Sequence, residues 1–516
     1  MASAPGMMAD QPHLPVANKA LLTVAIMAAM VMQVLDTTIA NVALPHMQAS
    51  LGATQETVSW VLTSYILASA IAIPITGWLS DRIGMRVLLL GSVGLFVFAS
   101  ALCGIATSLE EMVAFRVLQG IGGAFLGPLC QSIMLDINRP SEQARAMSIY
   151  GMGAMVGPIM GPILGGYLTE TVNWRWCFIV NVPVGAVCLA GLWFLLPEKK
   201  SPPRAFDVFG FSLLAITLTS LQLMLDRGQH QDWFSSTEIW IYCGLCVCAF
   251  WMFAVHVATA RHPIFPPIML RDRNLMTSVF FMFVLGMVLF AAMALLPPLL
   301  ENLFGYPVVD TGLILAARGV GVFITMGMAG RLVGKVDPRI LVGLGFAIAA
   351  FSLWLMSGWS LEQDWVPFVL NGFVQGLGIG LVFVPLNVLA FGTLTPSYRT
   401  EGAAMMNLSR NIGSSIGIAV VTFLLARNIQ ISHSDLVQHV TSGSLPADPA
   451  MASRFSSLGD AALSVVDGVV NQQAAMIAYL DNFVLMAWAS LLAVPFVLLL
   501  RKPARRAGAP PPVIAD

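Results

Sequence analysis

Apolar runs of about twenty residues recur from one end of the chain to the other, and short polar connections separate them. A run of this length can cross the hydrocarbon core of a bilayer as one helix. Hydrophobic residues make up 57% of the 516 residues and charged residues only 10%, which excludes an ordinary soluble globule. The predicted fold class is an all-α membrane protein with fourteen transmembrane helices. Their centres are predicted near Met30, Ser69, Val97, Gly122, Met155, Val187, Ile216, Cys248, Met287, Val320, Ala349, Gly378, Gly413 and Ala489.

Basic residues are distributed unevenly between the two sets of connections. Most of the 26 Lys and Arg residues fall before the first span, after the even-numbered spans or after the last span. The positive-inside rule places this side in the cytoplasm. Residues 1–19 and 501–516 are therefore expected to be a cytoplasmic N-terminus and a cytoplasmic tail. The first apolar run is too long for a signal-peptide core, so it is expected to remain as a span.

Short matches at a constant offset of 256 residues indicate an internal repeat. Gln119 reappears as Gln375, and Gly157 and Gly161 reappear as Gly413 and Gly417. Two related six-helix halves are predicted at 20–197 and 263–500, with a linker and two extra helices at 198–262 between them. Duplicated halves would place a substrate path between them. Chance similarity between glycine-rich apolar helices is the alternative.

Glycines recur every fourth residue in the predicted fifth span, at Gly153, Gly157 and Gly161. This spacing gives a helix a face without side chains, on which another membrane helix packs closely. Pro158 and Pro162 lie in the same span, and each removes a backbone donor and disturbs the preceding turn. The segment is expected to be a kinked or bending helix. Both a structural role and a moving part are compatible with this pattern.

Four ionisable residues fall inside the predicted spans, where charge is costly and often functional: Asp36, Arg116, Arg318 and Arg410. Asp36 and Arg116 are both expected in the outer third of the membrane, so a mutual pair is plausible. That pair could carry function or be purely structural. Three cations against one anion would favour anionic or electron-rich apolar ligands, unless helix termini or lipid headgroups compensate the charge.

Two polar segments are expected on the outer side. One runs from Asp226 to Trp240, and its Trp residues favour the membrane surface. The other is a predicted periplasmic loop at about 428–481, rich in Ser, Ala and Gln. A loop of this length is usually functional or disordered, so it is either a docking surface or a tether.

Motifs for other classes of function are lacking in the sequence. We find no phosphate-cradling loop, nucleophile elbow or metal-ligand spacing, so no enzyme activity, metal or cofactor is expected. The seven cysteines lie in apolar runs without nearby His partners, which favours helix packing over metal binding. Basic runs with interleaved aromatic residues are also lacking, so nucleic-acid binding is not expected.

Several segments resemble the motifs of the fourteen-span drug:proton antiporters of the major facilitator superfamily. Leu35–Pro45 (LDTTIANVALP) resembles the first-span motif, and Gly77–Arg86 (GWLSDRIGMR) resembles the signature loop after the second span. Met85 and Val87 depart from the usual basic character of that loop. The other matching segments are Arg116–Gly122, Gly153–Gly166, Trp174–Trp176, Asn181–Pro183, Leu225–Gly228 and Asp232–Ser236, of which the last two are similar to EmrB-type transporters.

This resemblance implies a proton-coupled efflux transporter that exports lipophilic toxic compounds by alternating access. It implies a bacterial inner-membrane location and a tripartite pump with a periplasmic adaptor (EmrA-type) and an outer-membrane channel (TolC-type). No cofactor is implied besides the coupling proton. The residues involved would be Asp36 and Arg116 for proton coupling; Asp81, Arg82, Arg86, Gly153, Gly157, Pro158, Gly161 and Pro162 for the conformational gate; and Asp36, Gln119, Asp226, Arg318 and Arg410 for the substrate path.

Two further interpretations are compatible with the sequence. The first is a metabolite or lipid exporter of the same fold, and the second is a membrane scaffold that transports nothing. The fifth-span motif argues against a symporter.

Overall fold

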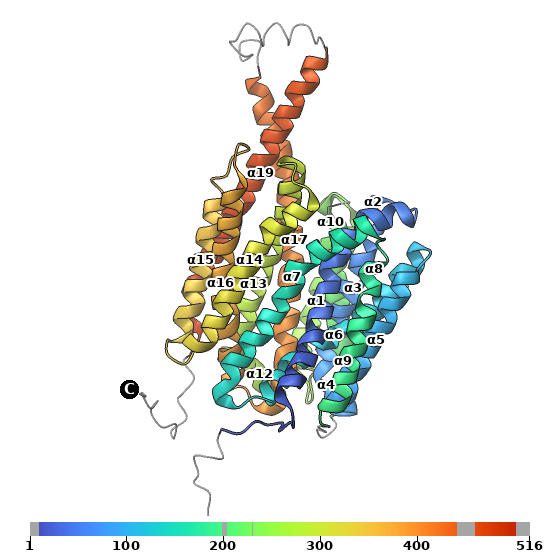
Figure 1. Cartoon of the computed structure of the whole chain (residues 1–516), viewed down its shortest axis with the longest axis vertical. Coiled ribbons are helices and arrows are strands. Elements are labelled where there is room, and N and C mark those ends of the chain that lie inside the picture. Colours follow the sequence, from blue (N-terminus) through green and yellow to red (C-terminus); the bar gives the residue numbers. More distant parts are fainter. Residues whose placement is uncertain (1–9, 199–203, 230, 441–459, 502–516) are drawn as a thin grey trace, which may run out of the picture.

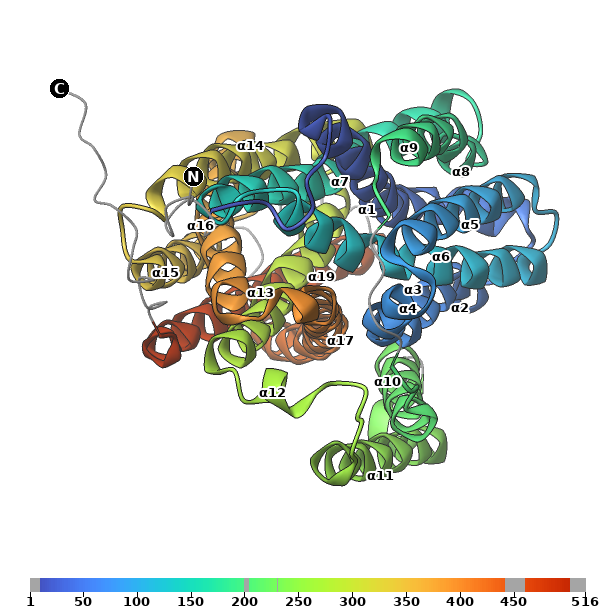
Figure 2. The ribbon, with the colours of Figure 1, turned by 90° about the horizontal axis from the view of Figure 1, so that it is seen from below.

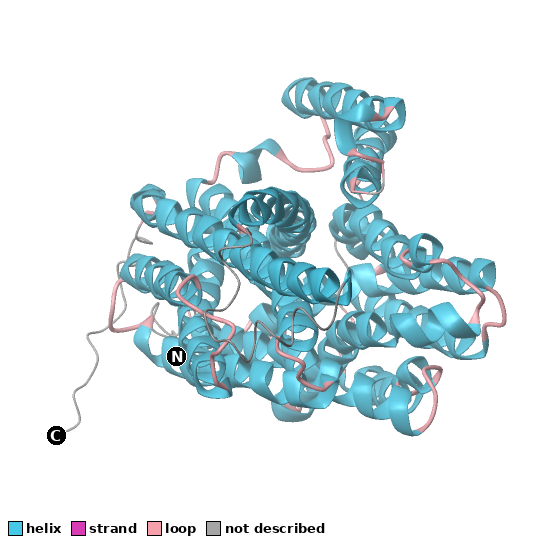
Figure 3. Cartoon of the chain, turned by 90° about the horizontal axis from the view of Figure 1, so that it is seen from above, coloured by secondary structure: helices cyan, strands magenta, loops and turns pink. Residues whose placement is uncertain are grey.

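The computed structural model describes residues 10–198, 204–229, 231–440 and 460–501. Over these residues the secondary structure is helical, without strands (Figure 3). Fourteen of the described helical segments are long and apolar enough to cross a membrane. Figure 1 shows them as a bundle of roughly aligned helices. The predicted all-α membrane fold with fourteen spans is therefore confirmed.

The N-terminal half supplies six spans. They are formed by α1 (Lys19–Ser50); α3, η1 and α4 (Trp60–Ala72, Ile73–Ile75 and Thr76–Ile83); α5 (Met85–Ile105); α6 (Leu109–Asp136); η2 and α7 (Pro140–Glu142 and Gln143–Thr171); and α8 and α9 (Trp176–Ile179 and Asn181–Leu195). A short helix, α2 (Gln55–Val58), precedes α3.

Two inserted spans, α10 (Val208–Gly228) and α11 (Thr237–Thr259), follow this half, with η3 (Trp233–Ser235) between them. Figure 2 shows both outside the main bundle, with α11 farther out than α10. The C-terminal half then contains α12 (Pro267–Leu270), α13 (Arg273–Pro298) with the π-helical η4 (Leu299–Leu303), α14 (Val308–Leu332), α15 (Pro338–Met356), α16 (Trp365–Thr393), η5 (Pro396–Tyr398), α17 (Arg399–His439), α19 (Asp460–Phe496) and η6 (Val497–Leu499).

The two ends of the bundle differ in chemistry. We call the end that holds Lys19, Arg82, Arg204 and Arg399 the basic end, and the opposite end the hairpin end.

Several helices begin with a polar side chain that accepts a backbone hydrogen bond, such as Ser108 before α6. Such caps satisfy backbone donors where a helix starts.

At the hairpin end, the structure differs from the loop predicted at about 428–481. Instead of a loop, α17 continues to His439 and α19 begins at Asp460, while residues 441–459 lie outside the described part. Figure 1 shows the two helices projecting beyond the other spans. His433 hydrogen-bonds to Asp467 at 3.1 Å between the two helices, which therefore support each other after the apolar run has ended. Hydropathy alone marks where the apolar run stops, and not where the helix stops.

Glycine packing follows the repeat seen in the sequence. A Cβ atom on Gly157 or Gly161 would lie 2.7 Å from Val34 C or 2.1 Å from Thr38 Oγ1 on α1. The repeat counterparts of these two glycines on α17 also pack closely, in both cases against the backbone of α13: Gly413 at Phe283 and Gly417 at Met287. Equivalent helices in the two halves therefore pack through equivalent positions.

The helix α7 lies at the boundary between the halves. One side packs on α1 through its glycines, and the other side contacts α14 of the C-terminal half. On that second side, Ile163 faces Gly312 and Ile159 faces Gly319. The expected bending helix is thus one continuous helix from Gln143 to Thr171, with Pro158 and Pro162 inside it.

Candidate transport site

Asp36 lies at the centre of a buried polar cluster in the N-terminal half. Its side chain is 0% exposed, and its oxygens accept hydrogen bonds from three side chains. Arg116 Nη1 donates to Oδ2 at 2.7 Å, and Gln119 Nε2 and Asn181 Nδ2 donate to Oδ1 at 2.8 and 2.9 Å. The structure thus joins three spans, α1, α6 and α9, at a single carboxylate.

Arg116 is fixed by the groups around its guanidinium. Nη1 also donates to Gln119 Oε1 at 2.8 Å, and Nε donates to the backbone oxygen of Val61 at 3.0 Å. The guanidinium carbon lies 4.4 Å from the ring centroid of Tyr65 and 5.6 Å from that of Phe178. Hydrogen bonds and cation–π contacts together compensate for removing this charge from water.

Asn181 belongs to the site, although sequence analysis assigned it no role. It begins α9, where Nδ2 donates to both Asp36 Oδ1 and Ser100 Oγ, the latter at 3.0 Å. Ser100 in turn donates to the backbone oxygen of Phe178. Asn181 lies in one of the matching motif segments, but an uncharged amide gives no signal of cost inside an apolar run.

The groups around Asp36 balance its charge. A carboxylate that accepts hydrogen bonds from an arginine and two amides is stabilised in a dry interior, and these bonds join α1 to α6 and α9.

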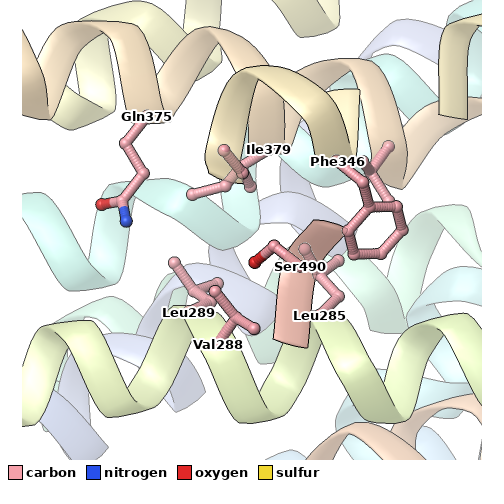
Figure 4. Close-up of a pocket in the computed structure, with 9 residues that line it drawn as sticks. Leu285, Val288, Leu289, Phe346, Gln375, Ile379 and Ser490 are labelled. Atoms are coloured by element: carbon pink, nitrogen blue, oxygen red, sulfur yellow. The ribbon is translucent and has the colours of Figure 1, made fainter. Parts of the chain in front are cut away.

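The C-terminal half keeps Gln375 at the counterpart of Gln119 but lacks the charged pair. Neither Gln375 Oε1 nor Nε2 has a hydrogen-bond partner among the described residues. Gln375 lines a small pocket between α13, α15, α16 and α19 (Figure 4). The volume of this pocket is about 10 Å³. The lining residues are Leu285, Val288, Leu289, Phe346, Ala349, Gln375, Ile379, Val382 and Ser490. Such a space fits about one water molecule and not a drug-sized ligand.

Three other candidates for the substrate path lie apart from the Asp36 cluster. Asp226 accepts a hydrogen bond from Thr63 Oγ1 at 2.5 Å. This bond joins the inserted helix α10 to α3 of the N-terminal half. Arg318 lies on α14 and Arg410 on α17, both in the C-terminal half. Only Gln119 among the remaining path candidates contacts Asp36 directly.

A second polar cluster joins the two halves at the basic end. Arg204, in the linker before α10, forms ion pairs with Asp81 of α4 and Glu401 of α17. Trp78 Nε1 donates to the backbone oxygen of Arg204 at 2.9 Å, and its ring lies 4.4 Å from that of Phe206. Burial lowers the pKa of Arg204, but the two carboxylates raise it more, so the net shift is upward and the cation is retained. We call Asp81, Arg204 and Glu401 the linker latch.

The other basic residues of the signature loop do not reach the C-terminal half in this conformation. Arg82 is exposed. Arg86 Nη2 donates to the backbone oxygen of Trp193, and its guanidinium carbon lies 5.8 Å from that ring, so it joins α5 to α9 within one half. The resemblance assigned Asp81, Arg82 and Arg86 to a gate, whereas Arg204 and Glu401, which complete the contact, lie outside the matching motifs.

Further polar contacts between the halves lie near the same end and involve the last part of α6. Asp136 pairs with Arg399 at 2.8 Å, and Gln131 Oε1 accepts from Asn407 Nδ2 at 2.9 Å. Gln131 Nε2 also donates to Asn387 Oδ1 on α16. These contacts and the linker latch hold the two halves together at the basic end.

Comparisons with known proteins agree with this architecture. A match to the Major Facilitator Superfamily covers residues 26–418. The chain is 36% identical over 455 residues to the multidrug export protein EmrB of Escherichia coli K12, covering 88% of this chain and 89% of that protein. It is 31% identical over 510 residues to the fatty acid resistance protein FarB of Neisseria gonorrhoeae, covering 97% and 99%.

Among solved structures, the human organic anion transporter MFSD10 matches with a TM-score of 0.58 at 14% identity. That match covers 95% of this chain and 100% of the other, and it supports the fold alone. The fourteen spans and the family match agree with the sequence relatives, and the chain belongs to the major facilitator superfamily, among its EmrB-type multidrug transporters.

Proposed function

We propose that this protein exports lipophilic toxic compounds in exchange for protons by alternating access. The observation that carries the proposal is Asp36, a fully buried carboxylate held by Arg116, Gln119 and Asn181 from two other helices. Such a group couples transport when one conformation favours its ionised form and another its protonated form. Separation of Asp36 from Arg116 in one of the two conformations would favour the protonated form there.

The available energy is sufficient for this exchange. One elementary charge moved across the membrane potential releases about 2.3 kcal/mol per 100 mV. About 1.4 kcal/mol corresponds to a tenfold concentration ratio. One proton can therefore drive more than a tenfold gradient of substrate.

The linker latch supports the conformational part of the proposal. It closes the basic end through ion pairs that can separate, whereas α7 stays attached to α1 through its glycine contacts. Rocking of one half against the other would open the latch and change the contact between α7 and α14. That motion would expose the space between the halves to opposite sides in turn.

Proteoliposomes containing the purified protein test the function. A lipophilic substrate added outside should move protons across the membrane, and an imposed pH gradient should drive substrate accumulation. Collapse of the gradient with an ionophore should abolish accumulation, and empty liposomes supply the background. Accumulation that is unaffected by the ionophore would contradict proton coupling, and a complete absence of transport would favour a membrane scaffold.

An exporter of metabolites or lipids is the second candidate, and the similarity to the fatty acid resistance protein FarB favours it over a membrane scaffold. The same vesicles distinguish the two export functions. A multidrug exporter accepts structurally unrelated compounds, whereas a dedicated exporter accepts one chemical series.

We also propose that the basic end faces the cytoplasm in a bacterial inner membrane and that both termini lie on that side, because the positive-inside rule favours this orientation. The helix α11 offers a matched test, because exposed Ser235 precedes it and exposed Thr259 ends it. In a cysteine-free background, Ser235→Cys should react with a membrane-impermeant thiol reagent added to intact spheroplasts. Thr259→Cys should react only after permeabilisation, and the reverse pattern would invert the orientation.

The projecting ends of α17 and α19 are the proposed docking element for a periplasmic adaptor (EmrA-type), which would connect to an outer-membrane channel (TolC-type). Their projection beyond the other helices supports this assignment (Figure 1). Deletion of residues 432–464 should reduce co-purification with the adaptor and leave transport in proteoliposomes intact. Unchanged adaptor binding after deletion of this element and of 229–236 would exclude both polar segments as the docking site.

A further inference from the structure

Gln375, on α16, carries a buried amide without a partner from the protein. The residue is 1% exposed, and neither Oε1 nor Nε2 has a hydrogen-bond partner among the described residues. A buried donor or acceptor without a partner is costly, because it has lost its hydrogen bonds to water. In folded proteins such groups are commonly satisfied by an ordered water molecule. The amide therefore indicates a binding site for a small polar molecule.

A second polar side chain lines the same pocket. Ser490, which is fully buried on α19, donates its hydroxyl proton to the backbone oxygen of Met486 at 2.9 Å. Its oxygen can still accept a hydrogen bond. Figure 4 shows the side chains of Gln375 and Ser490 pointing into the space between the helices. The other seven lining residues are apolar.

The size and the polar groups of this pocket suit one water molecule. The space is sufficient for about one, and a buried water molecule needs about two to four polar partners. Here it would accept a hydrogen bond from Gln375 Nε2 and donate one to Ser490 Oγ. These bonds would connect α16 to α19, the fourth and sixth spans of the C-terminal half.

The pocket has the same place in its half as the Asp36 cluster has in the other. That cluster is built from the first, third, fourth and sixth spans, through Asp36, Ser100, Gln119 and Asn181. The pocket lies between α13, α15, α16 and α19, which are the first, third, fourth and sixth spans of the C-terminal half. Gln375 is the repeat counterpart of Gln119.

The glycine contacts between helices identify the counterpart of Asp36 itself. These contacts are made on α1 at Val34 and Thr38, and on α13 at Phe283 and Met287. Asp36 lies midway between the first two residues, and Leu285 lies midway between the second two. Leu285 is therefore the structural counterpart of Asp36, and it lines the pocket.

The two equivalent sites differ in their polar partners. In the N-terminal half, Asp36 and Arg116 both hydrogen-bond to the amide of Gln119. Their counterparts are Leu285 and, at the repeat offset of Gln119, Gly372. Neither residue has a polar side chain, so the amide of the C-terminal half has lost both kinds of partner.

We propose that the pocket at Gln375 binds one water molecule, which supplies in the C-terminal half the hydrogen bonding that Asp36 supplies in the N-terminal half. The water would join α16 to α19 without bringing a charge into the membrane. No ionisable residue lines the pocket. The repeat would thus keep a polar site in both halves and a titratable carboxylate in one. This assignment does not depend on the proposed export function.

Radiolytic hydroxyl-radical labelling tests the proposal, because X-rays produce radicals from a bound water molecule at its own site. The full chain in nanodiscs is irradiated, and oxidised peptides are quantified by mass spectrometry. Phe346 lines the pocket and is buried, so it should be oxidised in the wild type. Phe391 is also buried and does not line the pocket, so it should remain unmodified.

Two variants remove the partners of the water molecule. Gln375→Leu replaces the amide by an apolar group of similar size and should abolish the oxidation of Phe346, because a single polar partner does not hold a buried water. Ser490→Ala is the smaller change and should reduce the oxidation if the leucine variant proves unstable. The matched control is Gln472→Leu, the same replacement at an exposed position of α19, which should leave the oxidation of Phe346 unchanged.

Three outcomes would overturn the proposal. The first is a wild type in which Phe346 is not oxidised, which would show a dry pocket. The second is oxidation of Phe346 that persists in both Gln375→Leu and Ser490→Ala. The third is oxidation of Phe391 together with Phe346 in the wild type, since water would then extend along α16 instead of occupying one enclosed site.

Discussion

The carboxylate of Asp36 is stabilised by hydrogen-bond donors that belong to different helices. Arg116 supplies the charge, while Gln119 and Asn181 complete the coordination of Oδ1. Removing a neutral donor leaves the ion pair in place but weakens the hold on the ionised carboxylate. The neutral donors are therefore the most informative residues to change.

Asn181→Leu should slow drug-driven proton flux. The change removes one neutral hydrogen bond to Asp36 Oδ1 and the contact that it makes between α9 and α1. A hydrogen bond to a charged group contributes about 1.5–3 kcal/mol, so the rate should fall about tenfold or more. The measurement is the initial rate of drug-driven proton flux in proteoliposomes.

Ser100→Ala is the control for this change, because it removes an acceptor of Asn181 and keeps the Asn181–Asp36 bond. It should slow the flux much less. Equal losses in both variants, or an unchanged rate for Asn181→Leu, would contradict the role given to Asn181.

The charged pair of this site and Gln119 could be named from the sequence, whereas Asn181 could not. Asp36 and Arg116 stand out because charge inside an apolar run needs an explanation. Asn181 carries no such cost. Arg204 and Glu401 lie outside or at the end of an apolar run, where charged residues are ordinary, so only their spatial proximity reveals the linker latch.

At the scale of single elements, α7 has two unlike sides. The side toward α1 is a row of glycines, of which Gly157 lies against backbone, and the side toward α14 carries Ile159 and Ile163. Close glycine packing binds α7 to its own half, while the side-chain contact with the other half can be rearranged. The sequence showed the glycine row but could not show which neighbour it faces.

Gly157→Ala should destabilise the protein more than Gly153→Ala. A methyl group at position 157 would lie 2.7 Å from the backbone carbon of Val34, which cannot move freely. At position 153 it would meet the end of the flexible Met27 side chain. Overpacking of a rigid contact typically costs about 1–3 kcal/mol. Thermal unfolding of the purified variants compares the two sites, and equal midpoints would contradict a rigid contact at Gly157.

The ends of α17 and α19 show the limit of hydropathy as a guide to an element. The predicted spans end where the sequence becomes polar. The helices α17 and α19 continue beyond that point because they pair with each other, for example through the His433–Asp467 hydrogen bond. Pairing between segments distant in the sequence is a tertiary effect that no local window contains.

For the molecule as a whole, the basic end is held closed by the linker latch and the contacts of α6. Arg204→Gln should increase the population that is open at this end, because Asp81 and Glu401 would lose their shared cation. Spin labels at Ile83 and Ile340, which are exposed at the basic end on the two halves, report the separation by double electron–electron resonance.

Arg86→Gln serves as the matched control, since Arg86 contacts Trp193 in its own half. It should leave the distance distribution like that of the wild type. A distribution unchanged by Arg204→Gln would show that the latch does not contribute to closure.

Asp36 is the residue proposed to couple substrate export to proton movement. Accumulation of substrate driven by an imposed pH gradient is measured in proteoliposomes containing Asp36→Asn, a variant that keeps the size of the side chain but cannot release a proton. Exchange of labelled for unlabelled substrate without a gradient, in the same vesicles, shows that the variant is folded. We expect retained exchange with no accumulation above the equilibrium level, whereas accumulation comparable to the wild type would place the coupling proton elsewhere.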